Sequence, residues 1–327
     1  MNVVMIVLII LTLVSSLMKK QRSNLPTPFK TKNETINHLE LLTLPILLTY
    51  TVEQIAMKMD QHIASRFGSD AVSTLAYATS TSTVVSGIFI TALLVITFPK
   101  MAKLAKPLQL TEMKHALSGS IVGMSLFMIP VIAAVTMFAH PVSMLLFQYG
   151  AFDAEAVDVM SNLLFFYSFS LLGNGLSLLI SRMFFAIGDF KTPVMVAVLT
   201  VVTHFVLNVL LTSFVGITGL AVATSLSSVG GLTLLLLMLR RKVGSLQLRR
   251  TLISLNKIAG ASITMAFGAY SVYQYLLAFN SIMALVVSAL VGLGIYGILL
   301  LIFRIREVDY LIATTVDHMR KWGGKRK

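Results

Sequence analysis

Residues 191–242 read KTPVMVAVLTVVTHFVLNVLLTSFVGITGLAVATSLSSVGGLTLLLLMLRRK. This stretch contains two apolar runs, 193–215 and 217–239, and each is near the roughly 20 residues that a helix needs to cross about 30 Å of hydrocarbon. Lys and Arg stand at both outer ends, and neither lies in the turn between the runs. Because loops rich in Lys and Arg stay cytoplasmic, the stretch predicts a helical hairpin that enters and leaves the membrane on the cytoplasmic side.

The same alternation extends over the whole chain. Further apolar runs lie at about 3–18, 40–59, 72–98, 117–139, 158–181, 255–278 and 281–303. All but two of the 26 Lys and Arg residues fall in every second gap between runs, and the two exceptions are Lys58 and Arg66. The pattern predicts an all-α integral membrane protein of about nine transmembrane helices, with the N-terminus outside and the C-terminus in the cytoplasm.

Composition supports this class of protein. The mean hydropathy is +0.86, and 12% of the residues are charged, whereas about 25% is usual in soluble domains. The net charge of +13 is then a signal of membrane topology. As a footprint for nucleic acid it would need a soluble basic face, which this composition does not provide. Cysteine is absent, so the sequence offers no disulfide and no thiolate ligand.

The organisation along the chain follows from the polar segments. A leading helix, 1–18, is followed by a basic cytoplasmic linker, 19–39, and then by an eight-helix body. After the last helix comes a basic cytoplasmic tail, 306–327. The longest outside loop contains an apolar run, 142–147, which predicts a short helix lying at the outer interface.

The sequence gives little support for an enzyme. The six histidines are scattered, and none has a second metal ligand at helical spacing. No glycine-rich phosphate loop followed by Lys and Ser or Thr is present. We therefore predict a non-enzymatic membrane protein with no metal and no cofactor, and the sequence leaves any coupling ion or use of the membrane potential open.

Polar residues inside apolar runs are costly in lipid and mark candidate binding sites. Glu53 and Asp60 are seven residues apart on one helical face, and Lys58 is close enough to reach either acid. They could form the charged wall of a substrate cavity, with Lys58 contacting an anionic headgroup. Alternatively, Lys58 and Asp60 are solvated in the outer headgroup zone, and for Asp60 we favour this second interpretation.

Further polar and helix-bending residues are scattered along the body. The hydroxyl run 79–83, together with Asn162, Asn174 and Asn208, is typical of packing between helices and could alternatively line a polar path. His204 is expected to be an interhelical hydrogen-bonding residue rather than a proton relay. The candidate kinks or hinges are Pro45, Pro130, Gly173 and Gly175.

Two segments resemble a known family. These are residues 148–156, QYGAFDAEA, and residues 182–194, RMFFAIGDFKTPV, and an ordered series of shorter matches extends the likeness over roughly 40–245. The segments resemble the MurJ (MviN) family of lipid II flippases in the MOP exporter superfamily. The resemblance implies a MOP/MATE-like C-terminal lobe of six helices at 40–245 and two additional helices at 246–305. The first five of the family's fourteen helices would be missing.

The family's activity would make this chain a flippase in the bacterial cytoplasmic membrane. It would move an undecaprenyl-diphosphate-linked glycan precursor for peptidoglycan or surface polysaccharide synthesis, with the last two helices forming a groove for the lipid tail. Where the family has an Arg and, three residues on, another polar or charged group, this chain has Ser80 and Thr83. Arg182 matches the family at the cytoplasmic end of its helix, and Lys58 is a candidate replacement contact for the diphosphate.

Two alternatives to a complete flippase stay open. The first is a MATE-like exporter of small cations, in which Glu53 and Asp60 would be the important groups. The second is a half-transporter or remnant that pairs with a separate N-terminal lobe.

Overall fold

The computed structural model describes residues 51–84, 87, 110–147, 154–246 and 248–303. These residues are almost entirely helical, and no strand occurs among them. The predicted leading helix, linker and tail, as well as Pro45 and residues 148–153, lie outside the described residues. The expected total of nine spanning helices is therefore untested.

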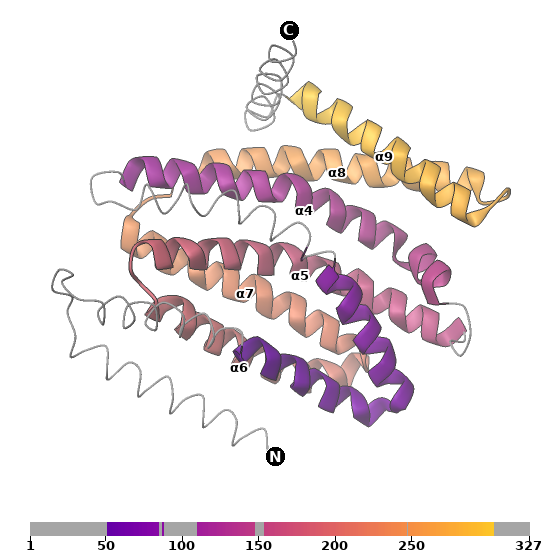
Figure 1. Ribbon diagram of the computed structural model, residues 1–327, viewed down its shortest axis with the longest axis horizontal. Helices are drawn as coiled ribbons and strands as arrows, with labels where there is room; N and C mark the ends of the chain where they lie inside the picture. The colour runs from indigo at the N-terminus through magenta and orange to yellow at the C-terminus, as the bar shows by residue number, and fades with distance from the viewer. Residues whose placement is uncertain (1–50, 85–86, 88–109, 148–153, 247, 304–327) are drawn as a thin grey trace, which may run out of the picture.

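Six long helices follow one another along the chain (Figure 1). They are α4 (Leu110–Phe147), α5 (Ala154–Ala186), α6 (Lys191–Val215), α7 (Thr218–Val243), α8 (Leu248–Leu276) and α9 (Ser281–Phe303). Each is long and apolar enough to cross a membrane, and each coincides with one of the apolar runs read from the sequence. The prediction of an all-α integral membrane protein is confirmed.

The six helices pack in a row in the spatial order α6, α7, α5, α4, α8, α9 (Figure 1). One apolar core fills the space between α4, α5 and α7, with Met124, Ile180 and Leu239 among its members. A second core joins α4 to α8 and α9 through residues such as Leu126 and Ile258. Helix α4 therefore connects the α8–α9 pair to the rest of the bundle.

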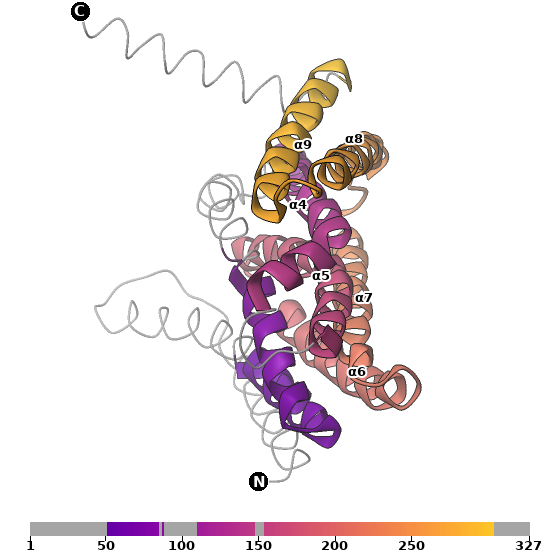
Figure 2. The same ribbon diagram turned by 90° about the vertical axis from the view of Figure 1, so that its right-hand side faces the viewer.

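A helical hairpin before α4 forms a further layer against this row (Figure 2). Residues 51–64 and 69–84 are helical, and the short helix η2 (Ser65–Phe67) and Gly68, at φ 107°, form the turn between them. Ile63, Leu75 and Ala78 of the hairpin pack against Leu163 of α5 and Leu220 of α7. The hairpin is thus held over α5 and the beginning of α7.

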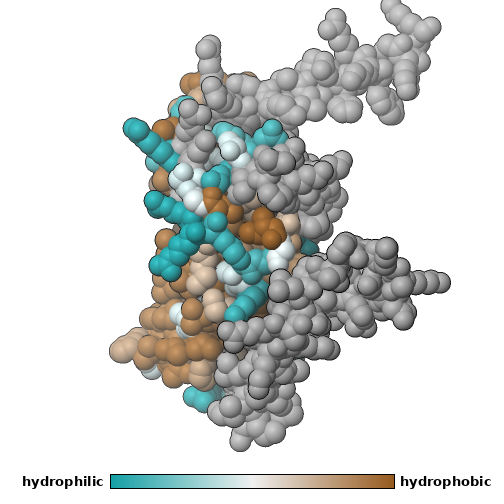
Figure 3. All heavy atoms as spheres, turned by 90° about the vertical axis from the view of Figure 1, so that its left-hand side faces the viewer, coloured by the Kyte–Doolittle hydropathy of each residue, from teal (hydrophilic) through white to brown (hydrophobic). Residues whose placement is uncertain are grey.

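Basic residues gather at one end of the described bundle. At this end Lys242 of α7 pairs with Asp189, which precedes α6, and Lys257 of α8 donates to the carbonyl oxygen of Phe303 in α9 over 3.0 Å. The hydroxyls of Ser118 and Thr251 meet at 2.6 Å, which brings the starts of α4 and α8 to the same end. Figure 3 shows hydrophilic side chains concentrated on this face, so the charge pattern of the sequence correctly grouped these helix ends.

The Gly188-Asp189 turn explains part of the motif that resembles a known family. Gly188 has φ 79°, a conformation that suits glycine, and Asp189 accepts hydrogen bonds from the backbone nitrogen of Thr192 at 3.1 Å and from its hydroxyl at 2.5 Å. Burial tends to raise the pKa of Asp189, but the hydrogen bonds from Lys242 and Thr192 outweigh burial and hold that pKa below its ordinary value. The motif therefore fixes the α5–α6 turn.

One expectation about helix shape needs revision. The run 142–147 is not a separate interfacial helix, because α4 continues through Pro130 and Pro141 to Phe147. Helix α5 continues through Gly173 and Gly175. A Cβ atom on Gly173 would lie 2.7 Å from the Ser228 hydroxyl oxygen, so this glycine allows α5 to approach α7 closely. Whether Pro130, Gly173 or Gly175 bends during a working cycle stays a prediction.

Candidate functional site: an apolar cavity and a buried polar cluster

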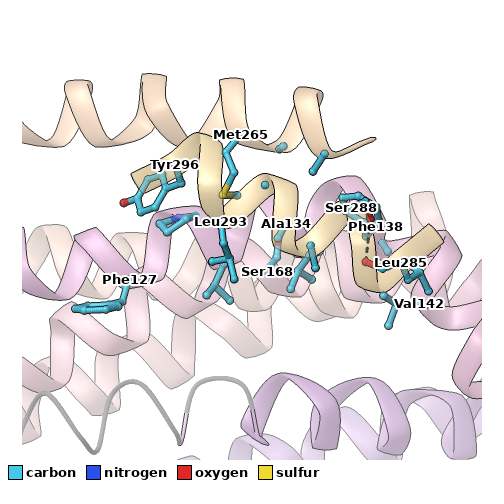
Figure 4. Close-up of a pocket in the computed structure, with 18 of the residues that line it drawn as sticks. Phe127, Ala134, Phe138, Val142, Ser168, Met265, Leu285, Ser288, Leu293 and Tyr296 are labelled. Atoms are coloured by element: carbon cyan, nitrogen blue, oxygen red, sulfur yellow. Dashed lines mark hydrogen bonds between the residues drawn. The ribbon is translucent and has the colours of Figure 1, made fainter. Parts of the chain in front are cut away.

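A cavity of about 870 Å³ lies between α4 and α5 on one side and α8 and α9 on the other (Figure 4). Helix α4 contributes Phe127, Ala134 and Phe138, helix α8 contributes Met265, and helix α9 contributes Leu293. The lining is almost entirely apolar. Its volume falls within the range of about 300–1,000 Å³ that is usual for small-molecule sites.

Four hydroxyls of the lining, those of Thr81, Ser168, Ser288 and Tyr296, are hydrogen-bonded to backbone carbonyl oxygens. Ser168 donates to the Phe165 carbonyl oxygen at 2.7 Å, and Ser288 donates to the Leu285 carbonyl oxygen at 2.9 Å. The hydroxyl of Tyr296 donates to the carbonyl oxygen of Leu126 at 2.7 Å. Because these hydroxyls are already engaged, the cavity offers a ligand mainly hydrocarbon surface.

The wall formed by α8 and α9 depends on small residues. Buried residues recur every fourth position along α9, which places them on one face of the helix: Ala284, Ser288, Gly292, Tyr296 and Leu300. A Cβ atom on Gly292 would lie 3.1 Å from the Cβ of Ala269, so α9 approaches α8 closely at this level. Sequence reasoning singled out Pro130, Thr81 and Ser82 for other reasons but none of the residues of α8 and α9 in the lining, although this four-residue spacing was a readable signal.

The predicted charged wall does not form as one unit. Lys58 is exposed, and its amino group donates to the side-chain oxygen of Gln61 at 3.1 Å. Glu53 is also exposed, whereas Asp60 is buried. Among the described ion pairs none joins Lys58 to either acid, so the expectation that Lys58 reaches Glu53 or Asp60 is not met.

The predicted hydroxyls divide between two faces. Ser80 and Thr83 are exposed, and the hydroxyl of Thr83 donates to the Thr79 carbonyl oxygen at 2.8 Å. Thr81 and Ser82 instead line the apolar cavity. Arg182, the remaining candidate for substrate binding, is half-buried near the end of α5, at the basic end of the bundle. The described site residues from the sequence thus lie apart from one another rather than in one pocket.

Asp60 belongs to a second feature, a buried polar cluster. Its carboxylate accepts a hydrogen bond from the Asn208 amide nitrogen at 2.6 Å, and the ring nitrogen Nε2 of His204 lies 3.6 Å away. The same Nε2 is 3.1 Å from the Thr224 hydroxyl of α7. The interpretation of Asp60 as a solvated residue of the headgroup zone is therefore wrong, because α6 covers it. His204 and Asn208 do act between helices, as expected.

The fold and the cavity define a multi-pass helical membrane protein with a hydrocarbon-lined recess beside α8 and α9. Two solved structures share the fold. A lipid II flippase MurJ in an inward closed conformation aligns with a TM-score of 0.67 and 23% identity, covering 86% of this chain and 57% of that one. An outward-facing multidrug resistance MATE transporter of the MOP superfamily aligns with a TM-score of 0.50 and 15% identity, covering 78% of this chain and 63% of that one.

Sequence comparison gives the family. The family model described as lipid II flippase MurJ matches residues 3–294, and the chain belongs to this family. A probable lipid II flippase MurJ of Vibrio cholerae is 28% identical over 290 residues, which are 86% of this chain and 55% of that protein. The lipid II flippase MurJ of Burkholderia cenocepacia is 28% identical over 199 residues, which are 61% of this chain and 39% of that protein. The chain thus spans about half the length of these relatives, or less.

Proposed function

We propose that this chain forms the C-terminal half of a flippase that translocates an undecaprenyl-diphosphate-linked glycan precursor, lipid II or a related molecule, across the bacterial cytoplasmic membrane. The observation that carries the proposal is the 870 Å³ apolar cavity beside α8 and α9. A polyprenyl tail is a long hydrocarbon, and burial of apolar surface contributes about 25 cal/mol per Å². A cavity whose described lining is almost entirely apolar suits such a tail.

The headgroup would be held elsewhere, on the hairpin 51–84. Lys58 supplies a cation whose amino group is exposed and held by a neutral partner, Gln61. Ser80, Thr83 and Glu53 are exposed on the same hairpin, and Arg182 is the candidate contact at the basic end. A diphosphate favours cationic donors of this kind. Lys58→Ala is expected to weaken transport of the lipid-linked substrate, and unchanged transport would remove Lys58 from the site.

The proposed domain division supports this separation of tail and headgroup. In it, residues 40–245 form the six-helix lobe, and 246–305 form the pair of helices that completes the tail groove. The translocation path of a two-lobed transporter also needs an N-terminal lobe, which we propose as a partner of this half. Purification of the full chain from its native membrane together with such a lobe would support the pairing, and transport by this chain alone in vesicles would rule it out.

The test of the groove uses adjacent residues of α9. Ala289 lines the cavity and is exposed, so Ala289→Phe fills the recess without entering a packed core. Leu290→Phe is the matched control, because Leu290 is 65% exposed and lies outside the lining. We expect Ala289→Phe to abolish crosslinking by a photoreactive polyprenyl diphosphate in reconstituted vesicles and Leu290→Phe to leave it intact. Equal crosslinking of the two variants would refute the groove assignment.

A MATE-like exporter of small cations is the second candidate function. It is favoured by the shared fold with the MATE transporter and by the buried carboxyl of Asp60. Cells expressing the chain would then lose accumulated cationic dye faster than control cells, and Asp60→Asn or Glu53→Gln would reverse the effect. Absence of dye efflux together with crosslinking by the polyprenyl probe would decide for the flippase.

The orientation proposed here places the basic end in the cytoplasm, the N-terminus outside and the C-terminus inside. The chain contains no cysteine, so single cysteines can be introduced without background. Residues near Arg240 and Lys114 should be protected from a membrane-impermeant thiol reagent, and a cysteine near Asn280 should be labelled. Labelling of the first two positions from outside would overturn the proposed orientation.

A further inference from the structure

The buried cluster around Asp60 has no role in the groove. Its members come from three helical segments: Asp60 from residues 51–64, His204 and Asn208 from α6, and Thr224 from α7. Asp60 is 7% exposed, His204 5% and Asn208 fully buried. Such a site holds an ionisable carboxyl and an ionisable imidazole within 3.6 Å of each other and away from water.

The carboxyl of Asp60 has no Lys or Arg partner among the described ion pairs. The ionisable groups that the structure places against it are His204 from α6 and Tyr167 from α5, while α7 presents only the hydroxyl of Thr224. Lys58 on its own helix is occupied by Gln61. A buried carboxylate without a cation is strongly unfavourable, so a proton within the cluster is needed to neutralise it.

The geometry accommodates that proton. The Asn208 amide can take two orientations that exchange its oxygen and its nitrogen, and the hydrogen-bond network determines which orientation is adopted. As placed, the Asn208 nitrogen lies 2.6 Å from Asp60 and 3.3 Å from Nε2 of His204, while the Asn208 oxygen is buried and makes no hydrogen bond with the described residues. With the amide turned, its oxygen accepts from a protonated Asp60 carboxyl. A separation of 2.6 Å is normal for an O–H···O bond.

The chemistry of the donors favours a proton over a metal ion. Alkali and alkaline-earth cations bind preferentially through oxygen ligands, and here a ring nitrogen stands between Asp60 and Thr224. The hydroxyl of Thr224 donates to the Leu220 carbonyl oxygen at 2.9 Å, so its oxygen is available to accept from the His204 N–H. The Asp60 carboxyl, the Asn208 oxygen, the His204 ring N–H and the Thr224 hydroxyl then lie in a polar cluster that carries one mobile proton.

We propose that Asp60, Asn208 and His204 form a proton-binding site that couples the hairpin 51–84 to α6 during transport. Gain of a proton by the carboxyl, with rotation of the Asn208 amide, holds residues 51–64 against α6. Loss of that proton leaves a buried charge and favours separation of the two segments. The inference rests on the proposed transport function for its purpose, but the site can be tested without any substrate.

The experiment is infrared spectroscopy of the full chain in lipid over pH 5 to 9, which detects the carbonyl stretch of a protonated buried carboxyl. We expect the parent protein to show such a band that titrates and that Asp60→Asn abolishes. Asp158→Asn is the matched control, because Asp158 also pairs with a histidine, His140, at 3.3 Å, but both side chains are exposed. This control should leave the titrating band unchanged.

Two further measurements complete the test. His204→Gln replaces the ring with an amide that can form hydrogen bonds but cannot carry a charge. This variant should retain the band, and the midpoint of the titration should shift by about one pH unit or more. Replacing choline with sodium in the buffer should leave the band and the midpoint of its titration unchanged. The proposal is overturned if the parent and Asp60→Asn titrate identically, if His204→Gln shifts nothing, or if sodium alone displaces the proton, which would indicate a metal-ion site. Failure of polyprenyl crosslinking would leave these spectra unaffected, so the two proposals fail separately.

Discussion

Substitution of Gly219 by Ala should loosen the contact between α6 and α7. A Cβ atom at this position would lie 2.6 Å from the carbonyl carbon of Leu211 and 2.7 Å from the backbone nitrogen of Thr212. Both are backbone atoms on the preceding helix, so no side-chain rotation relieves the overlap. The turn between the helices contains only Gly216 and Ile217, so it leaves little freedom for α6 to move away.

The magnitude follows from two opposing effects. Overpacking that shifts backbone typically costs about 1–3 kcal/mol, and an overlap with backbone belongs in the upper half of that range. Replacement of Gly by Ala in a helix returns up to about 1 kcal/mol. We therefore expect Gly219→Ala to lower the free energy of unfolding by about 1–2 kcal/mol.

Gly230→Ala is the control for this experiment, because Gly230 lies in the same helix and an added Cβ meets nothing within 4 Å. It should be neutral or stabilising by up to about 1 kcal/mol. The assay is reversible unfolding of the purified chain in mixed micelles, monitored by circular dichroism for parent and both variants. Equal stability of Gly219→Ala and Gly230→Ala would refute the close approach of α6 and α7.

Two further predictions concern hydrogen bonds between segments. Tyr296→Phe removes the hydrogen bond to the Leu126 carbonyl oxygen at 2.7 Å and should reduce the free energy of unfolding by about 0.5–1.5 kcal/mol. A disulfide between cysteines introduced in α4 and α9 should then form faster. An unchanged rate would contradict a role of this hydrogen bond in holding α9 against α4. Asp189→Asn removes the partner of Lys242 and the carboxylate acceptor of Thr192, costing up to about 1 kcal/mol at neutral pH. Because the pKa of Asp189 lies below its ordinary 3.8, this stabilisation is present above pH 3.8 and is lost as the pH falls through the lowered pKa. Thermal unfolding at pH 7 and pH 3 should show the difference between parent and variant shrinking, and a constant difference would contradict it.

Hydrophobic run length and charge placement were enough to predict the described helices. The runs 193–215 and 281–303 coincide with α6 and α9 almost to the residue, because a bilayer selects apolar segments by length. The order of the helices in the row was not predictable in the same way. It depends on side-chain fit, such as Gly173 against Ser228, and run length carries no information about such partners.

The candidate site was harder to predict than the fold. The sequence places Asp60 in the headgroup zone because Asp60 and Lys58 lie at the outer end of the apolar run 40–59, and Lys58 is indeed exposed. What buries Asp60 is Asn208, 148 residues later. The cavity is hard to predict for a related reason: most of its lining is made of ordinary apolar residues of α4, α5, α8 and α9, and no single segment distinguishes them from lipid-facing residues.

The engaged hydroxyls of the cavity have a consequence for selectivity. A recess in which the Ser168, Ser288 and Tyr296 hydroxyls are bonded to backbone carbonyls offers mainly hydrocarbon surface, so it would distinguish chains by width and length. Under the proposed function, chemical discrimination among headgroups would then fall to residues outside the recess, and a saturated tail of the same length and width should enter as readily as an unsaturated one. In this arrangement, binding of the hydrocarbon tail and selection of the headgroup would depend on different residues. Mutation could therefore change one property without disturbing the other.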